Sequence, residues 1–204
     1  METAMNKKTI GALALFSVLI LAGCASSPPS KFYMLNPIAP KDATSQYKAD
    51  LGGKMISIGP VTVPAYVNRP QMVERVSPEE LRLLEFNRWA EPVDKAVILT
   101  LQDNLNELLG KKGYTFFKWN EFKQSNYQLI VQVTRLDGAP GGKFGLTARW
   151  SVLGGDNHKL LLFQGCRIII DVPGSSPKDL VTAHSEALAD LSRRIATSLQ
   201  ETLP

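Results

Sequence analysis

Two stretches of the sequence carry apolar residues along one side of a helix, and they constrain the fold more than any other feature. Three- and four-residue spacings place each set on a single helical face, which needs an apolar surface to cover. One face of a β-sheet can take both helices. The first stripe is Val93, Val97, Leu101, Leu105 and Leu108, and the second is Leu180, His184, Ala187, Leu188, Leu191, Ile195 and Leu199.

Capping signals set the ends of these helices. Pro92 suits a first turn, and Gly110, followed by two lysines, predicts a stop after Leu109. Ser176, with Pro177 next and Asp179 at the third helical position, has the form of a capping box.

Strand patterns fill the space between the helices. Residues 55–64 predict a strand with a bend at Gly59-Pro60, and residues 114–119 a short one. From residue 127 to 171, three alternating runs separated by glycine-rich turns predict an antiparallel meander.

Residues 71–86 contain two short runs with interleaved charges around Ser77-Pro78-Glu79-Glu80, which predicts a β-hairpin. A helix that starts at Pro78 is the alternative. The predicted class is therefore α/β (α+β): a single mixed, largely antiparallel sheet with two amphipathic helices packed on one face, plus a β-hairpin insertion.

The N-terminus has the pattern of a secretion signal. Lys7 and Lys8 precede an apolar run over residues 10–22, which is shorter than the roughly 20 apolar residues of a membrane-spanning helix. The end of this run and the two residues after it resemble the lipobox of bacterial lipoproteins, in the order Leu21, Ala22, Gly23 and Cys24.

On this interpretation residues 1–23 are removed. Cys24 then carries a covalent diacylglycerol and a palmitate-type N-acyl chain, and no other cofactor is expected. An ordinary secreted protein with a cysteine near its new N-terminus is the alternative.

After the signal we expect two parts. Residues 24–50 form the lipidated N-terminus, a small-residue and proline tether, and a docking segment. Within this segment, Phe32-Tyr33-Met34-Leu35 predicts an edge strand or a clip onto the domain. Residues 51–204 form a single globular periplasmic domain.

Charge and motifs exclude several functions. Loss of residues 1–23, with Lys7, Lys8 and Glu2, lowers the net charge from +4 to +3, so nucleic acid is not an expected partner. His158 and His184 lack metal-ligand spacing, and no catalytic constellation is recognisable. Cys166, in an apolar run, is expected to be a buried small side chain rather than a nucleophile.

One cluster suggests a contact surface. The hairpin is flanked by Tyr66, Arg69 and Pro70 on one side and by Arg88 and Trp89 on the other. Arginine and tryptophan are enriched at binding hot spots, so these five residues are the candidate partner-binding site. The alternative interpretation is that Trp89 fills the core and Arg69 caps a carbonyl.

The chain also resembles a known family, the PqiC-like auxiliary lipoproteins of ABC-type, MCE-associated transport systems. The residues that carry the resemblance run in order along the mature chain. They are residues 21–24, 32–35, 61–66, 69–71, 89–92 and 180–196.

The resemblance implies a non-enzymatic periplasmic subunit on two helices and a mixed sheet. Its lipid anchor would lie in the outer membrane, because Ala25 rather than Asp follows Cys24. The implied partners are an MCE-domain protein, an inner-membrane permease reached through it, and further copies of the chain in a ring. The implied process is movement of lipid or another hydrophobic solute. An envelope lipoprotein that activates a periplasmic cell-wall synthase or assembly enzyme is the alternative.

Overall fold

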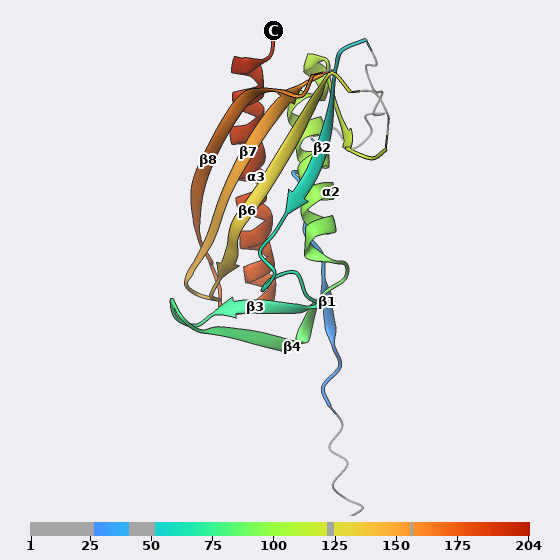
Figure 1. Ribbon diagram of the computed structural model, residues 1–204. Helices are drawn as coiled ribbons and strands as arrows, with labels where there is room; N and C mark the ends of the chain where they lie inside the picture. The colour runs from blue at the N-terminus through green and yellow to red at the C-terminus, as the bar shows by residue number, and fades with distance from the viewer. Residues whose placement is uncertain (1–26, 41–51, 122–124, 156) are drawn as a thin grey trace, which may run out of the picture.

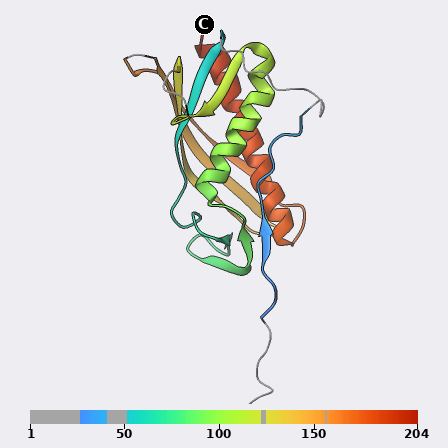
Figure 2. The ribbon, with the colours of Figure 1, turned by 90° about the vertical axis from the view of Figure 1, so that its right-hand side faces the viewer.

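The computed structural model describes residues 27–40, 52–121, 125–155 and 157–204. The chain forms two layers, a five-stranded sheet and a pair of long helices, with a smaller three-stranded sheet at one end (Figure 1). Seen from the side, both helices lie on the same face of the large sheet (Figure 2).

The large sheet has the strand order β5-β2-β6-β7-β8. Strand β2 pairs in parallel with both of its neighbours, β5 and β6. The strands β6, β7 and β8 form the predicted antiparallel meander. The strand bounds are β2 Lys54–Thr62, β5 Tyr114–Lys118, β6 Tyr127–Gly138, β7 Lys143–Gly154 and β8 Lys159–Asp171.

In β6 and β7 the buried face of the sheet is the one under the helices. Alternate residues of these two strands point into this layer and are almost fully buried, since successive side chains of a strand lie on opposite faces. On the opposite face, Pro60, Arg149 and Phe163 border a shallow hollow of about 240 Å³. The buried residues of β6 and β7 include Leu129, Val131, Val133, Phe144, Leu146, Ala148, Trp150 and Val152.

Helix α2, Val93–Leu109, follows Pro92 as predicted. Gly110 does not end the helical path, because it keeps right-handed helical angles and the chain continues as the 3-10 helix η1, Gly110–Lys112. The stop is Gly113, at φ 80°, whose N–H donates to the carbonyl of Gly110. Glycine takes this left-handed conformation without the steric cost of a side chain.

Helix α3, Pro177–Thr202, begins with the predicted capping box, in which Ser176 and Asp179 exchange side-chain and backbone hydrogen bonds. Every residue of its predicted stripe is buried. No helix in the described ranges is long and apolar enough to cross a membrane.

The predicted hairpin is also present. Strands β3, Gln71–Arg75, and β4, Leu81–Trp89, pair antiparallel around a polar turn. The segment predicted as a clip supplies β1, Lys31–Tyr33, which pairs in parallel with the end of β4. The insertion is thus a sheet of its own, with the order β1-β4-β3.

The predicted fold class is confirmed, with two additions from the structure. The hairpin recruits β1 into a second sheet, and half of the pairings in the large sheet are parallel. The predicted signal and lipobox, residues 21–24 included, lie outside the described residues.

Candidate functional site

Pairing of β3 with β4 brings together three of the five predicted contact residues, namely Pro70, Arg88 and Trp89. Gln71 is in register with Arg88, and the Trp89 N–H donates to the carbonyl of Pro70 over 2.8 Å. Tyr66 and Arg69 lie in the loop that leads to β3, where Arg69 N–H donates to the Val67 carbonyl.

Trp89 is a core residue. Its exposed fraction is 7%, and its ring meets the His184 ring edge-on, with centroids 5.1 Å apart. On its other side His184 contacts Phe144, at a centroid distance of 4.2 Å. Of the two interpretations of Trp89, the structure therefore favours a side chain that fills the core beneath the helices. Little of this side chain is accessible to a partner.

His184 is held neutral by its surroundings. Burial lowers its pKa to about 4, against a smaller opposing effect of the Leu180 carbonyl and the Asp137 charge. Nδ1 lies 2.8 Å from the Leu180 carbonyl oxygen and donates to it, which places the ring proton on Nδ1. This agrees with the expectation of a core histidine.

Arg69, Pro70 and Arg88 remain at least partly exposed. Arg88 donates to the Glu85 carbonyl over 2.9 Å, and its guanidinium lies 3.8 Å from the Glu85 carboxylate. Nε of Arg69 is buried and has no hydrogen-bond partner among the described residues, so the carbonyl-cap interpretation of Arg69 gains no support. These three residues are the part of the predicted site that a partner could reach.

Tyr66 has a different role from the one predicted. Its hydroxyl donates to Oδ2 of Asp137 over 2.5 Å, at the end of β6. Arg75 of β3 donates to both carboxylate oxygens of Asp137, over 2.6 and 3.0 Å. Arg135 adds a third cationic contact, 3.1 Å from Oδ1.

The Asp137 side chain is fully buried, yet it stays charged. Burial alone would raise the pKa of Asp137, but the hydrogen bonds from Arg75 and Tyr66 and the charge of Arg135 hold that pKa below its usual range. Burial and the neighbouring carboxylate raise the pKa of Tyr66. The side chains of Tyr66, Arg75, Arg135 and Asp137 therefore form a buried ionic cluster, called the ionic lock below, that joins the small sheet to the large sheet.

Sequence reasoning missed this lock. Asp137 falls where the strand pattern gives way to a glycine-rich turn, and Arg75 is 62 positions away, so spacing carries no sign of the pair. The only local signal is a carboxylate at the end of a strongly apolar strand. Gly145 lies opposite Asp137 in register and leaves room for the Arg135 side chain, because a Cβ at position 145 would lie 2.9 Å from the Arg135 guanidinium.

A second buried polar contact holds the N-terminal segment. Asn104 of α2 donates to the Ser192 hydroxyl of α3 over 3.0 Å, and its Oδ1 accepts the N–H of Ile38 over 2.6 Å. Asn36 N–H donates to Ser185 of α3. The segment after β1 thus runs over the seam between the helices (Figure 2).

The remaining titratable groups were compared with the needs of a metal site and of a reactive thiol. The described ranges contain no group of three or more His, Cys, Asp or Glu side chains placed to hold a metal. Cys166 is a half-buried free cysteine, and burial raises the pKa of its thiol, which disfavours the reactive thiolate. It packs against the core but is only partly buried, where the sequence predicts a buried side chain.

These features define a two-layer α+β domain whose polar clusters join structural elements, with a partly exposed loop-and-hairpin surface beside them. Two crystal structures share the fold. One, of an uncharacterised protein, superposes with a TM-score of 0.69 at 19% identity and covers 84% of this chain and 99% of that one. Another, from Xanthomonas campestris, has a TM-score of 0.65 at 12% identity and covers 86% and 100%.

Sequence comparison supplies the family. The profile of the ABC-type transport auxiliary lipoprotein component family matches residues 33–196, and the chain belongs to this family. It is also similar to the intermembrane transport lipoprotein PqiC of Escherichia coli (strain K12), with 28% identity over 138 residues, 68% of this chain and 71% of that protein. The PqiC protein of Shigella flexneri matches to the same extent.

Proposed function

We propose that this chain is a non-enzymatic docking subunit of an intermembrane transport system for lipid or another hydrophobic solute. It is anchored in the outer membrane through Cys24 and faces the periplasm. The observation that carries the proposal is family membership over residues 33–196, together with the similarity to the intermembrane transport lipoprotein PqiC. The partners that follow are an MCE-domain protein and, through it, an inner-membrane permease.

The contact surface for this partner is the exposed part of the predicted cluster, Arg69, Pro70 and Arg88. Trp89 and Tyr66 support it from below, because both are engaged inside the domain. The Arg69 side chain is partly exposed, and a guanidinium pairs strongly with carboxylates, so it suits an acidic group of a partner. Assembly of several copies into a ring would repeat this surface around the conduit.

Anchoring is tested with Cys24→Ala in the full chain. The unchanged protein should fractionate with outer membranes and, after maturation, carry the mass of its acyl chains on Cys24. The variant should stay uncleaved or leave the outer-membrane fraction. Equal membrane partition and an equal mature mass in both proteins would refute lipidation.

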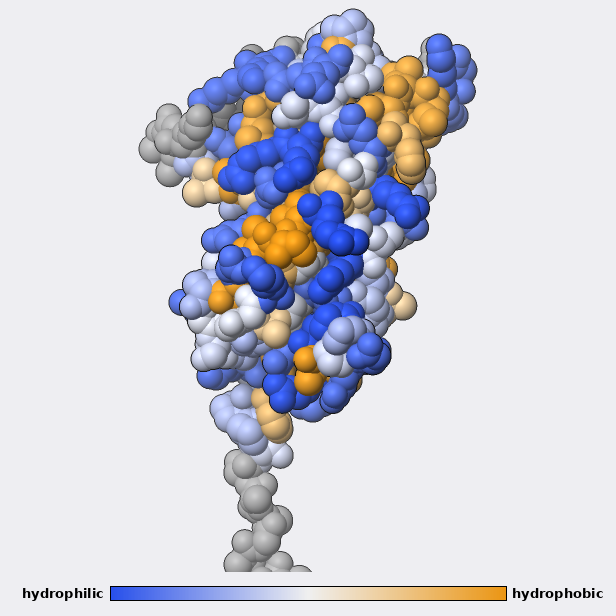
Figure 3. Space-filling view, turned by 90° about the vertical axis from the view of Figure 1, so that its left-hand side faces the viewer, coloured by the Kyte–Doolittle hydropathy of each residue, from blue (hydrophilic) through white to orange (hydrophobic). Residues whose placement is uncertain are grey.

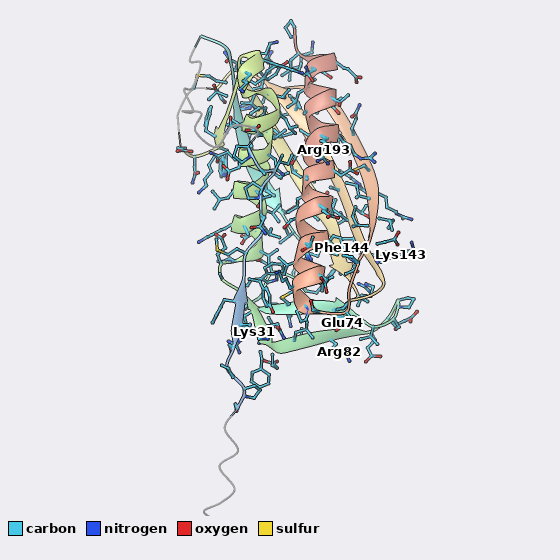
Figure 4. The ribbon with its side chains drawn as sticks, turned by 180° about the vertical axis from the view of Figure 1, so that it is seen from behind. Lys31, Glu74, Arg82, Lys143, Phe144 and Arg193 are labelled. Carbon is cyan, nitrogen blue, oxygen red and sulfur yellow. The ribbon has the colours of Figure 1, made fainter. Side chains whose placement is uncertain are left out.

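Docking is tested with Arg69→Ala, and the matched control is Arg193→Ala. Arg193 is exposed on α3, away from the end that carries Lys31 and Arg82 (Figure 4). Capture of the MCE-domain protein should fall at least several-fold for the first variant and stay unchanged for the second. Equal capture by both, with both folded, would show that the surface lies elsewhere.

A further inference from the structure

The docking segment buries only half of its apolar residues. Tyr33 and Leu35 point into the domain, and the Tyr33 hydroxyl donates to Asn87 of β4 over 3.0 Å. Phe32 and Met34 alternate with them and are 66% and 59% exposed. A strand with apolar residues on both faces needs a cover on each, and the described part of the chain covers only one.

Strand β4 continues this exposed apolar face. Phe32 is in register with Arg88, and Phe86 lies two residues before Arg88 on β4, where the pairing with β3 is irregular. Asn87 and Trp89 take the inner side, as the Tyr33 contact and the burial of Trp89 show. Phe86 is 41% exposed, so Phe32 and Phe86 are exposed apolar residues on neighbouring strands of the small sheet.

This face lies at the end of the domain where the chain leaves toward its N-terminus (Figures 1 and 2). Six residues lie between Cys24 and Lys31, and the seven steps from one to the other span at most about 25 Å. Helix α3, with 26 residues, is about 39 Å long and ends at the opposite pole. A lipid on Cys24 therefore keeps the small sheet, and not the far end of α3, next to the bilayer.

We propose that the outward face of the small sheet, around Phe32, Met34 and Phe86, lies on the surface of the lipid bilayer and is a second membrane contact beside the acyl chains. Apolar rings at this level enter the boundary between headgroups and acyl chains. This inference rests on the proposed lipid anchor at Cys24. Its consequence is a fixed orientation, with the long axis of the domain directed away from the membrane.

The test places the photo-crosslinking residue p-benzoylphenylalanine in the full chain at position 32, 86 or 163, one position per sample, in intact cells. Phe163 is the matched control: it is 64% exposed, and its neighbour Gln164 accepts a hydrogen bond from Ser198 near the far end of α3. On the β8 side, hydrophobic residues form separate patches between polar ones (Figure 3). After irradiation, adducts are identified by mass, and each sample is fractionated to confirm that the chain is on the membrane.

The proposal expects phospholipid adducts at positions 32 and 86, at a yield several-fold above that at 163. Lipid adducts of equal yield at all three positions, or none at 32 and 86 in a membrane-bound chain, would overturn it. Protein adducts at 32 and 86 would also overturn it, since they would make this face a protein interface. A chain that does not fractionate with membranes would refute the anchor on which both proposals depend.

Discussion

Arg75 and Asp137 join the two sheets of this protein through a pair of charge-assisted hydrogen bonds, 2.6 and 3.0 Å long. The carboxylate is fully buried and the guanidinium is mostly so. Because β3 has no backbone pairing with the large sheet, this side-chain contact and the Tyr66 hydroxyl supply the polar connection between the sheets. The position of the loop-and-hairpin surface therefore depends on a residue outside that surface.

Asp137→Asn should lower the free energy of unfolding by roughly 3 kcal/mol, because removal of one partner of a buried ion pair leaves the other partner uncompensated. The measurement is urea unfolding at neutral pH. Asp171→Asn is the control, since its 2.6 Å ion pair with Lys143 is exposed on both sides and should contribute almost nothing. Equal losses in the two variants would show that Asp137 is not a lock.

His184 makes stability depend on pH in the mildly acidic range. Its folded pKa of about 4 lies below the unfolded value near 6.5, so its contribution is complete above pH 6.5 and is lost as the pH falls toward 4. The loss is on the order of 3 kcal/mol. Unfolding measured at a series of pH values should show this slope in the unchanged protein and a much flatter profile in His184→Phe.

The exposed His158 provides the control for that series, because His158→Gln should leave the slope in place. A His184→Phe profile as steep as the original would assign the acid sensitivity to other groups. Asp137 acts in a lower window: its folded pKa is depressed, so its contribution is present above the unfolded pKa near 3.9 and disappears below it.

Asn104→Leu should release the N-terminal segment from the helix seam. The variant removes the acceptor of the Ile38 N–H and the donor to Ser192, which costs about 1–3 kcal/mol for groups left unpaired. Hydrogen exchange should speed up at Ile38 while the strands of the large sheet keep their protection. Ser192→Ala separates the two contacts, because it breaks the interhelical bond and spares the Ile38 contact.

The helix layer and the sheet layer of this fold could be predicted from the sequence, because the patterns that imply them are local. The α3 stripe and the Ser176 capping box are local patterns, and each implies its structure without knowledge of distant residues. Gly110 shows the limit even for local signals: the sequence predicts the helix stop at this glycine, whereas the backbone places it at Gly113.

Long-range side-chain contacts were not predictable in the same way. Composition predicts Tyr66 and Trp89 as contact residues, but their side chains turn inward to Asp137 and His184. Hot-spot composition does not separate a contact residue from a core residue, because tryptophan and tyrosine serve both purposes. Likewise, exposure of Phe32 beside the partly buried Tyr33 follows from the pairing with β4, which the sequence does not specify.

The most direct test of the central claim is chemical crosslinking of the tagged full chain in intact cells, followed by identification of the captured proteins. We expect an MCE-domain protein as the main partner, at a yield that falls several-fold in Arg69→Ala and is unchanged in Arg193→Ala. Capture of a cell-wall synthase in place of an MCE-domain protein would contradict the account and favour the activator alternative.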